Sequence, residues 1–570
     1  MRAVKIANFG KNPIAMRIYC VNLQEYVPFT GGETLASVAA RLADRLEIVP
    51  VCARVNNKDE GLSFPLYAPK QVEFLSLSTP TGQRSYIRTL CLVLYRALVT
   101  VAPGARLEMR NAVSGGYFCR ITQDGVAVAD PSALAQALKE EMGRIIAADL
   151  PIERKEQPTK EVVEMFRAQG LDAKVELLES LHELYTIYYK LDGVADTTLS
   201  PLFPATGRLG AFDFKVYEDG YLLLGCKGGD VTVAAEEKPQ PKLYRAFTAY
   251  REFNRVIGVS NAGQLNAAVE RGESAMIINV AEALHSKYIR EIAQSITERN
   301  AAGGARVVLI AGPSSSGKTT FTKRLSIELL TNLLTPVMIS LDDYFVDRHL
   351  TPRDESGDFD YESLDALDVA LFNQHLLALI AGEEVEMPTY NFETGAREFR
   401  GHRLSLPPNG VLLIEGIHGL NPALTAAIAD DLKFRVYVSA LSSISIDDHN
   451  WVSTTDNRLL RRIIRDYKYR GTSALSTIKR WPSVRRGEEK WIFPYQENAD
   501  AMFNSSFIFE LSVMREEAER VLSGVPRDVP EYAQAHRLRR FLSRFAPVSS
   551  QLIPPTSLIR EFVGGSSFKY

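Results

Sequence analysis

Residues 312–319 read Gly312-Pro313-Ser314-Ser315-Ser316-Gly317-Lys318-Thr319, which fits the phosphate-binding pattern G-x-x-x-x-G-K-[ST] at every fixed position. Residues 306–311 before it have the composition of a buried parallel strand, and residues 320–330 after it carry apolar side chains at helical spacing. In such a loop backbone N–H groups point at phosphate oxygens, the lysine reaches the outer phosphates, and the threonine offers a hydroxyl to Mg²⁺. The expected nucleotide contacts are Gly312, Pro313, Ser314, Ser315, Ser316, Gly317, Lys318, Thr319 and Thr320.

The bulk composition is that of an ordinary soluble protein. The chain has 570 residues, 46% of them hydrophobic and 24% charged, with a net charge of −3, so several domains are expected and no basic excess points to nucleic acid. The longest apolar runs, such as 411–414, are far shorter than the roughly 20 residues of a membrane span. The first residues lack a secretory pattern, and five cysteines without a C-x-x-C pair favour reduced thiols. We therefore expect a cytoplasmic protein without a membrane partner.

The pattern of apolar runs divides the chain into four parts. Residues 305–570 alternate strands (336–341, 410–415, 434–438) with helical stretches, which predicts a parallel α/β sheet. Residues 1–70 alternate short β runs with one helix from about 34 to 46, a β-grasp pattern. Residues 71–245 mix strands and helices and end near a charged, proline-bearing segment, and residues 246–304 form a helical connector.

Three carboxylates follow predicted strands of the parallel sheet. Glu415 ends the run 411–415, where it suits Mg²⁺ binding, and the pair Asp342 and Asp343 ends the run 336–341. A carboxylate at this edge can take a proton from an attacking hydroxyl, whereas a pair that only caps a turn would have no such role. A GTPase would need N-K-x-D downstream of the loop, and the sequence has none there, so phosphoryl transfer to a hydroxyl is favoured.

Six motifs in a fixed order resemble the uridine kinase branch of the uridine kinase/phosphoribulokinase family over about residues 305–515. They are the P-loop, 340–345, 358–360, 388–392, 414–416 and 456–466. The resemblance implies an ATP- and Mg²⁺-dependent kinase of a nucleoside or related small molecule. It selects Asp342 as base, with Lys318 and Arg465 also catalytic and Arg465 over the bound phosphates. It gives Thr319, Asp342 and Glu415 as metal ligands, and Asp360, Tyr390, Arg397, Arg462 and Arg470 as acceptor contacts.

A basic segment after residue 457 predicts a phosphate clamp independently of the family. Eleven Lys/Arg against three acids lie between Arg458 and Lys490. Arg458, Arg462 and Arg465 share one side of a helix, and we expect this helix to close as a lid, with Arg485 and Arg486 solvated. A solvated basic face or an RNA-binding surface are the alternatives.

Two departures from the uridine kinase pattern leave the acceptor open. Gly395 stands where those kinases carry a histidine, and Thr472 stands where they carry an arginine. Another nucleoside or a phosphorylated sugar therefore stays an alternative acceptor.

The front half resembles two modules of threonyl-tRNA synthetases, a TGS domain over about residues 1–62 and the editing-type domain that follows it. The second likeness rests on 115–119, 150–155 and 174–178. Editing needs an H-x-x-x-H site, but no histidine precedes His182, and Tyr86 and Leu90 stand near the expected pair. We expect the pocket in outline without hydrolysis or zinc.

The fold class expected is thus an α/β P-loop kinase domain preceded by a β-grasp TGS domain and an α+β synthetase-like domain. An RNA- or tRNA-associated regulatory protein switched by ATP is the rival from the binding class, because the front half could contact RNA or a small ligand. The oligomeric state stays open, with a homo-oligomer among the options.

Overall fold

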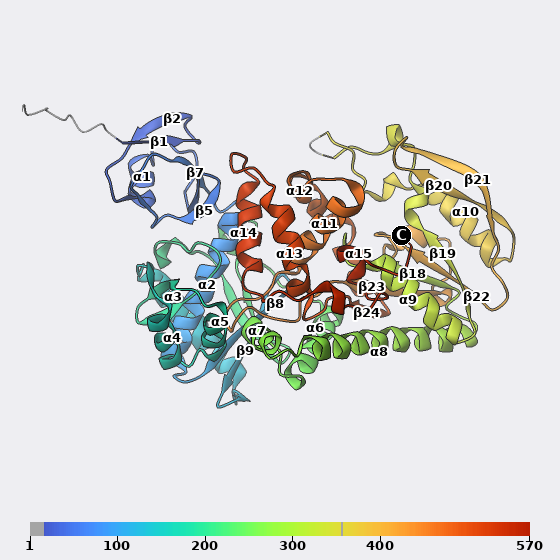
Figure 1. Ribbon diagram of the computed structural model, residues 1–570, viewed down its shortest axis with the longest axis horizontal. Coiled ribbons are helices and arrows are strands. Elements are labelled where there is room, and N and C mark those ends of the chain that lie inside the picture. Colours follow the sequence, from blue (N-terminus) through green and yellow to red (C-terminus); the bar gives the residue numbers. More distant parts are fainter. Residues whose placement is uncertain (1–15, 355–356, 570) are drawn as a thin grey trace, which may run out of the picture.

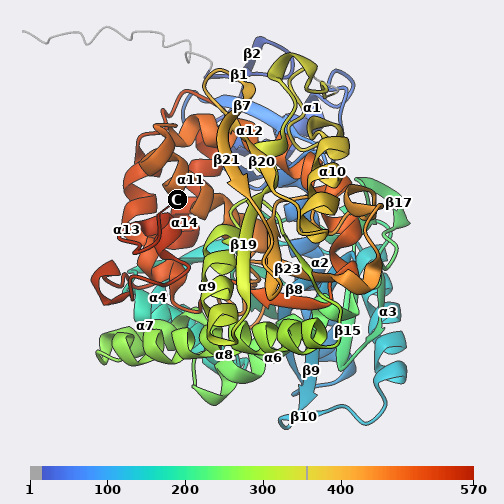
Figure 2. The same cartoon turned by 90° about the vertical axis from the view of Figure 1, so that its right-hand side faces the viewer.

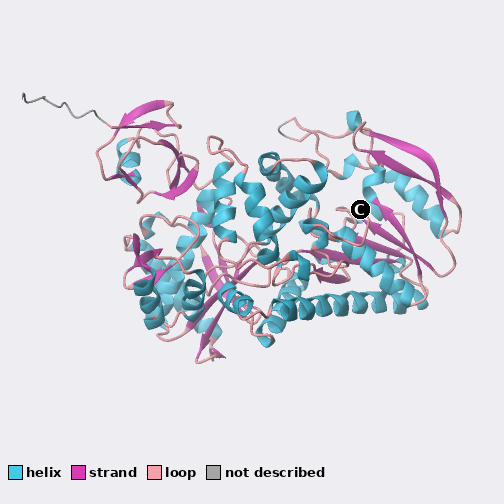
Figure 3. Cartoon of the chain, viewed as in Figure 1, coloured by secondary structure: helices cyan, strands magenta, loops and turns pink. Residues whose placement is uncertain are grey.

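The computed structural model describes residues 16–354 and 357–569 (Figure 1). The first fifteen residues of the expected β-grasp module lie outside the described residues. The colouring of Figure 3 shows strands and helices mixed along the whole molecule. Within the described residues, none of the helices combines the length and the apolar content that a membrane crossing needs.

The N-terminal part contains a small five-stranded sheet with one helix against it. The strand order is β2-β1-β7-β4-β5, and α1 begins after Thr34, whose hydroxyl accepts a hydrogen bond from the Ser37 N–H. The helix ends five residues before the predicted residue 46, since the turns after it let Leu42 and Leu46 both pack into the core. The bounds are β1 Arg17–Cys20, β2 Glu25–Pro28, α1 Leu35–Arg41, β4 Cys52–Val55, β5 Lys58–Gly61 and β7 Gln71–Leu75.

The second part is built around the long helix α2 (Pro80–Val101). Its apolar side chains are buried on most sides, because an antiparallel sheet, a smaller sheet and several helices surround it. The larger sheet runs β10-β9-β15-β14, with β8 also on β9, and the smaller runs β11-β12-β13. The principal bounds are β8 Arg106–Val113, β9 Gly116–Gln123, β10 Val126–Ala127, α3 Pro131–Ala147, β11 Glu153–Pro158, α4 Thr159–Ala168, α5 Asp172–Leu181, β12 Tyr185–Leu191, β13 Val194–Asp196, β14 Asp213–Tyr217 and β15 Gly220–Leu224.

Three helices lead from this part to the P-loop. They are α6 (Pro241–Val256), α7 (Ala262–Glu270) and α8 (Ser274–Ala301), and α8 extends beneath the C-terminal part in Figure 1. Its buried Ile289, Ile292 and Ile296 share one apolar core with Val308 and Phe321. The connector is therefore packed into the core of the P-loop part.

The P-loop part contains a five-stranded sheet in which all pairs are parallel, as predicted from its apolar runs (Figure 2). The order is β19-β22-β18-β23-β24, and β18 is buried throughout. The C-terminal ends of β19 and β22 stand side by side, since Ser340 pairs with Glu415. The bounds are β18 Val307–Ala311, α9 Lys318–Thr331, β19 Thr335–Ser340, β22 Gly410–Glu415, β23 Lys433–Ser439 and β24 Ala501–Asn504.

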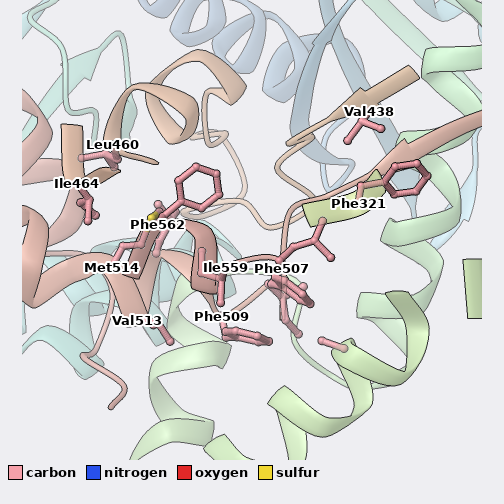
Figure 4. Close-up of a cluster of buried hydrophobic side chains, with 14 of the residues drawn as sticks. Phe321, Val438, Leu460, Ile464, Phe507, Phe509, Val513, Met514, Ile559 and Phe562 are labelled. Carbon is pink, nitrogen blue, oxygen red and sulfur yellow. The ribbon is translucent and has the colours of Figure 1, made fainter. Parts of the chain in front are cut away.

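A hairpin and a set of C-terminal helices flank this sheet. The hairpin consists of β20 (Val385–Asn391) and β21 (Ala396–Leu404), beside α10 (Val369–Ile380). Figure 4 shows the apolar cluster in which Phe321 and Val438 lie with side chains from the C-terminal helices, including Leu460, Met514 and Phe562. Those helices are α11 Thr454–Arg470, α12 Ala474–Trp491, α13 Glu510–Ser523, α14 Tyr532–Leu542 and α15 Arg560–Val563.

Candidate active site

The P-loop connects β18 to α9 in a conformation that requires glycine at both ends. A Cβ atom at Gly312 would lie 1.9 Å from the Val438 carbonyl oxygen. Gly317 has φ +83° and caps α9, a left-handed geometry that residues with a side chain adopt at a cost. The Lys318 ammonium donates to the carbonyl oxygens of Gly312 (3.0 Å) and Pro313 (3.4 Å). These two hydrogen bonds hold the Lys318 ammonium inside the P-loop, where bound phosphates would also lie.

Thr319 and Glu415 form an oxygen-rich pair beside the loop. The Thr319 hydroxyl donates to Glu415 Oε1 at 3.0 Å, while Glu415 Oε2 is buried and has no hydrogen-bond partner within the described residues. Burial raises the pKa of Glu415 to about 7, although Lys318 acts against this rise. Carboxylate and hydroxyl oxygens are ligands that Mg²⁺ prefers, so Thr319, Glu415 and the nearby Asp342 fit such an ion.

Asp342 and Asp343 point to different surroundings. Both lie in the short turn Leu341–Tyr344 after β19. The Asp343 carboxylate accepts a hydrogen bond from the Tyr390 N–H at 3.4 Å, so it faces the hairpin. Asp342 has its side chain open to a cavity, and the protein around that cavity desolvates it enough to raise its pKa against the opposing effect of Lys318.

One cavity of about 650 Å³ brings most of the predicted site residues together. Its lining comes from the P-loop, the turn after β19 with Asp342, the end of β22 with Glu415, the hairpin with Tyr390, and α11. The predicted residues that line it are Ser314, Ser315, Ser316, Gly317, Lys318, Thr319, Asp342, Tyr390, Glu415, Arg462, Arg465 and Arg470.

Three arginines of α11 surround the buried carboxylate of Asp466. Arg462, Arg465 and Arg470 lie 3.3, 3.0 and 3.5 Å from its oxygens. Arg462 also donates to the Ser314 hydroxyl at 2.8 Å, so this cluster touches the P-loop. The arrangement keeps the guanidinium groups in the cavity, where they can meet phosphate oxygens.

The structure divides the predicted basic segment into two helices and buries two of its arginines, while closure as a lid stays a prediction. Gly471 (φ +60°) separates two helices, α11 and α12. Arg458 is buried and paired with Glu488, and Arg461 is buried and paired with Glu510.

Arg485, expected to be solvated, donates to the same Glu488 at 3.0 Å. Part of the apparent excess of positive charge therefore belongs to internal ion pairs, which the sequence alone does not separate from surface charge.

Some predicted residues do not line the cavity. The Asp360 carboxylate accepts from the Glu362 N–H at 3.1 Å, and Arg397 pairs with Asp368 at 2.8 Å. Pro313 faces a second cavity, and Thr320 is buried, with its hydroxyl donating to Glu561 at 2.7 Å.

Several lining residues were not predicted from the sequence. Phe345 and Phe392 lie within the motifs 340–345 and 388–392 but had no role assigned, and Glu561 lies 241 positions from its partner Thr320. These residues are Phe345, Arg348, Tyr361, Glu362, Phe392, Arg480 and Glu561.

The two front-half positions that stand near the expected histidine pair are buried. Tyr86 and Leu90 lie within the core around α2, and the Tyr86 hydroxyl donates to the Ala211 carbonyl oxygen at 2.8 Å. The outline of an editing-type pocket stays a prediction.

A P-loop, a parallel sheet and a carboxylate-lined cavity define a nucleotide-dependent phosphotransferase site. The model of the phosphoribulokinase/uridine kinase family matches residues 307–508. A uridine kinase of Halobacterium salinarum is 30% identical over 193 residues, which cover 34% of this chain and 76% of the relative. The chain therefore belongs to the phosphoribulokinase/uridine kinase family.

The N-terminal half is similar to a different class of protein. A threonine–tRNA ligase of Rubrobacter xylanophilus is 27% identical over 190 residues, which cover 33% of this chain and 29% of the ligase. The chain thus spans less than a third of that relative.

Among solved structures, a putative fructose transport system kinase from Silicibacter is 20% identical, with a TM-score of 0.29, covering 38% of this chain and 98% of the other.

Proposed function

We propose that this protein transfers the γ-phosphoryl group of ATP to a hydroxyl group of a nucleoside or sugar, with Mg²⁺ as cofactor. The observation that carries the proposal is that Lys318, Asp342 and Tyr390 face one cavity. A protein that only changed conformation on binding ATP would need neither a carboxylate nor an aromatic ring on the acceptor side.

The proposal gives each group a role. The P-loop N–H groups and Lys318 hold the phosphates, and Asp342 accepts the proton of the acceptor hydroxyl. The acceptor oxygen forms its bond to the γ-phosphorus as the bond from that phosphorus to the β–γ bridging oxygen breaks, and ADP leaves with that oxygen. Thr319, Glu415 and Asp342 would hold Mg²⁺, which when bound offsets negative charge on the phosphate oxygens.

The α11 arginines would stabilise the transferring group. Arg462, Arg465 and Arg470 are already gathered beside the P-loop by Asp466. Phosphate oxygens compete for the same guanidinium donors, and charge-assisted hydrogen bonds to them are stronger than neutral ones. Asp360 and Arg397, placed at the acceptor by the family pattern, would need to reorient to reach it.

Replacement of Lys318 tests the proposal directly. Lys318→Ala should abolish ADP release from ATP and an acceptor mixture, while far-UV circular dichroism stays unchanged, since the ammonium contacts only loop carbonyls. Lys287→Ala, an exposed lysine of α8, is the matched control. Full turnover by Lys318→Ala would contradict the proposal.

A second candidate follows from the similarity to tRNA ligases. In it the front half, proposed to comprise a TGS-like module (1–70) and a synthetase-like module (71–245), binds RNA, and residues 246–304 connect it to an ATP-driven domain (305–570). Gel-shift titration of the full chain with bulk tRNA, with and without ATP, tests this. A salt-dependent complex that ATP alters would favour it.

A further inference from the structure

Arg348 reaches the acceptor side of the cavity from a short helical turn after β19. Its N–H donates to the Gly395 carbonyl oxygen at 2.8 Å, and its guanidinium donates to the Phe392 carbonyl oxygen. The neighbouring Asp347 carboxylate accepts from the Arg397 N–H at 3.0 Å. The hairpin turn thus holds both the backbone and the side chain of Arg348 in place.

Gly395 provides the space that the Arg348 side chain occupies. Gly395 has φ +71°, and a Cβ atom there would lie 2.6 Å from Arg348 Nε and 2.7 Å from its Cζ. Any other residue at position 395 would displace the guanidinium. This contact gives a physical reason for the departure from the uridine kinase pattern at position 395. A glycine in the turn leaves room for the cation of Arg348 beside it.

The charge of Arg348 is not matched by a carboxylate. Within residues 16–354 and 357–569, no acidic side chain lies within ion-pair distance of its guanidinium. The α11 arginines, by contrast, share Asp466. Arg348 lines the cavity together with Phe345, Tyr390 and Phe392.

A guanidinium with free donors next to an aromatic wall suits an acceptor that is partly apolar and carries an anion. Arginine binds carboxylate and phosphate groups through paired hydrogen bonds, and a neutral hydroxyl compound would leave this charge unused. We infer that the acceptor is a hydroxyl compound bearing a phosphate ester or a carboxylate, and that Arg348, seated on Gly395, binds this anion. The inference rests on the proposed phosphoryl transfer and names its substrate class.

The test compares matched neutral and anionic acceptors with the full-length protein, ATP and Mg²⁺. The pairs are ribose with ribose 5-phosphate and glycerol with glycerate, and uridine serves as the neutral nucleoside. ADP release is measured, and the phosphorylated product is verified by mass. We expect the anionic member of at least one pair to have a kcat/KM about 10- to 100-fold above its neutral partner, the size of a charge-assisted contact.

Variants assign that preference to Arg348. In Arg348→Gln the ratio of kcat/KM for the anionic acceptor to kcat/KM for its neutral partner should fall to near one, mainly through a higher KM. Arg348→Lys should retain part of the preference. Gly395→Ala should reproduce the loss, because the added methyl group takes the place of the guanidinium. Arg400→Gln, on the same hairpin with an exposed side chain, should change nothing.

The outcomes separate this inference from the proposed function. Preference for neutral acceptors, or equal loss with both kinds of acceptor in Arg348→Gln, would overturn the anionic acceptor and leave the kinase standing. An absence of phosphoryl transfer to every compound, with no Lys318-dependent ADP release, would overturn the proposed function and this inference with it.

Discussion

At the scale of single residues, identical side chains acquire different chemistry from their surroundings. Asp342 and Asp343 are adjacent, yet Asp343 accepts a backbone hydrogen bond from Tyr390, and Asp342 is open to the cavity. A carboxylate acting as a base must reach the proton it removes, so the free one is the better candidate. Their position after a strand presents the two as a pair, the family resemblance selects Asp342, and the surroundings of each side chain in the fold differ in the same sense.

Asparagine replacement at each position tests this distinction. Asp342→Asn should lower kcat by about 100- to 10,000-fold, the range for a positioned base, with a smaller change in ATP affinity. Asp343→Asn keeps an oxygen that can accept from the Tyr390 N–H and should retain most of the activity. Steady-state kinetics and nucleotide titration measure both. A larger loss in Asp343→Asn would show that the roles are reversed.

Glu362, which no motif indicated, is predicted to make stability depend on pH. Burial and the nearby Glu488 raise its pKa to about 7, although Arg462 and Lys318 lower it and Asp342 adds to the rise. The folded protein therefore keeps this proton at pH values where the unfolded chain has released it, so stability falls as pH rises between about 4.5 and 7.

Glu362→Gln removes the titrating group and should be stabilising at pH 8, by at most about 3 kcal/mol, and near neutral at pH 5. Thermal melts of the ligand-free protein at both pH values measure the difference. Glu383→Gln, an exposed glutamate, is the control. An equal shift of the two variants at pH 8 would contradict the role given to Glu362.

At the scale of elements, α11 is a core helix with an active face. Leu459, Leu460, Ile463 and Ile464 are buried in the main cluster, and the Arg458–Glu488 pair joins α11 to α12. Motion of the whole basic segment would break the buried Arg461–Glu510 pair, and motion of α12 alone would break the Arg458–Glu488 pair. Loss of one partner of a buried ion pair costs about 3–5 kcal/mol, so any closure over ligands is expected in the connection at residues 471–473.

Conservative replacement distinguishes the active face from the structural one. Arg465→Lys should lower the rate, because lysine cannot reproduce the paired hydrogen bonds of the guanidinium, and Arg486→Lys, whose side chain is mostly exposed, should be near neutral. Arg458→Lys should instead lower the melting temperature. Limited proteolysis with ATP and acceptor should change at the connection 471–473 and not within α11 or α12. Full activity in Arg465→Lys would remove the arginine cluster from the mechanism.

Local patterns predicted the elements, and distant partners decided the site. The strands β18 and β22 and the helices α2 and α3 follow from periodicity and flanking turn residues, which act within a few positions. The P-loop was found from its consensus pattern, and Glu415 from its place at the end of an apolar run. The cavity is also lined by Arg348, Glu362 and Glu561, whose contacts are with residues far away in the sequence. The burial of Arg458 and Arg461 likewise depends on acids 30 and 49 positions away.

At the scale of the whole molecule, the segment between β23 and α11 joins the two halves. In residues 440–453, Asp447 and His449 are buried against the synthetase-like part, and the Met109 N–H donates to the Asp448 carbonyl oxygen at 2.7 Å. Asn111 Nδ2 donates to the Ser442 carbonyl oxygen at 3.0 Å. Because α11 begins directly after this segment, the front half supports the helix that carries the phosphate-facing arginines.

The Lys174 ammonium forms buried ion pairs at this interface. It is 1% exposed, and its ammonium lies 2.6 Å from Asp196 and 2.8 Å from Asp447, while Asp196 also contacts His449. Burial alone would lower the pKa of Lys174, but the two carboxylates outweigh burial and hold it above its usual value. The lysine therefore stays charged at neutral pH, and both carboxylates depend on it.

Removal of this ammonium should loosen the junction without touching the cavity. Lys174→Ala leaves two buried carboxylates without their cation, so we expect a loss of about 3–5 kcal/mol and a lower first melting transition. Lys174→Met in an Asp196→Asn, Asp447→Asn background keeps the volume without the charges and should recover part of the loss. The exposed Lys190→Ala is the control. Because Lys174 lies outside the cavity, ADP release at low temperature should persist in Lys174→Ala and fail earlier on heating. A melting profile identical to that of the unmodified protein would mean that the hydrogen bonds and apolar contacts hold the two halves together without this ion pair.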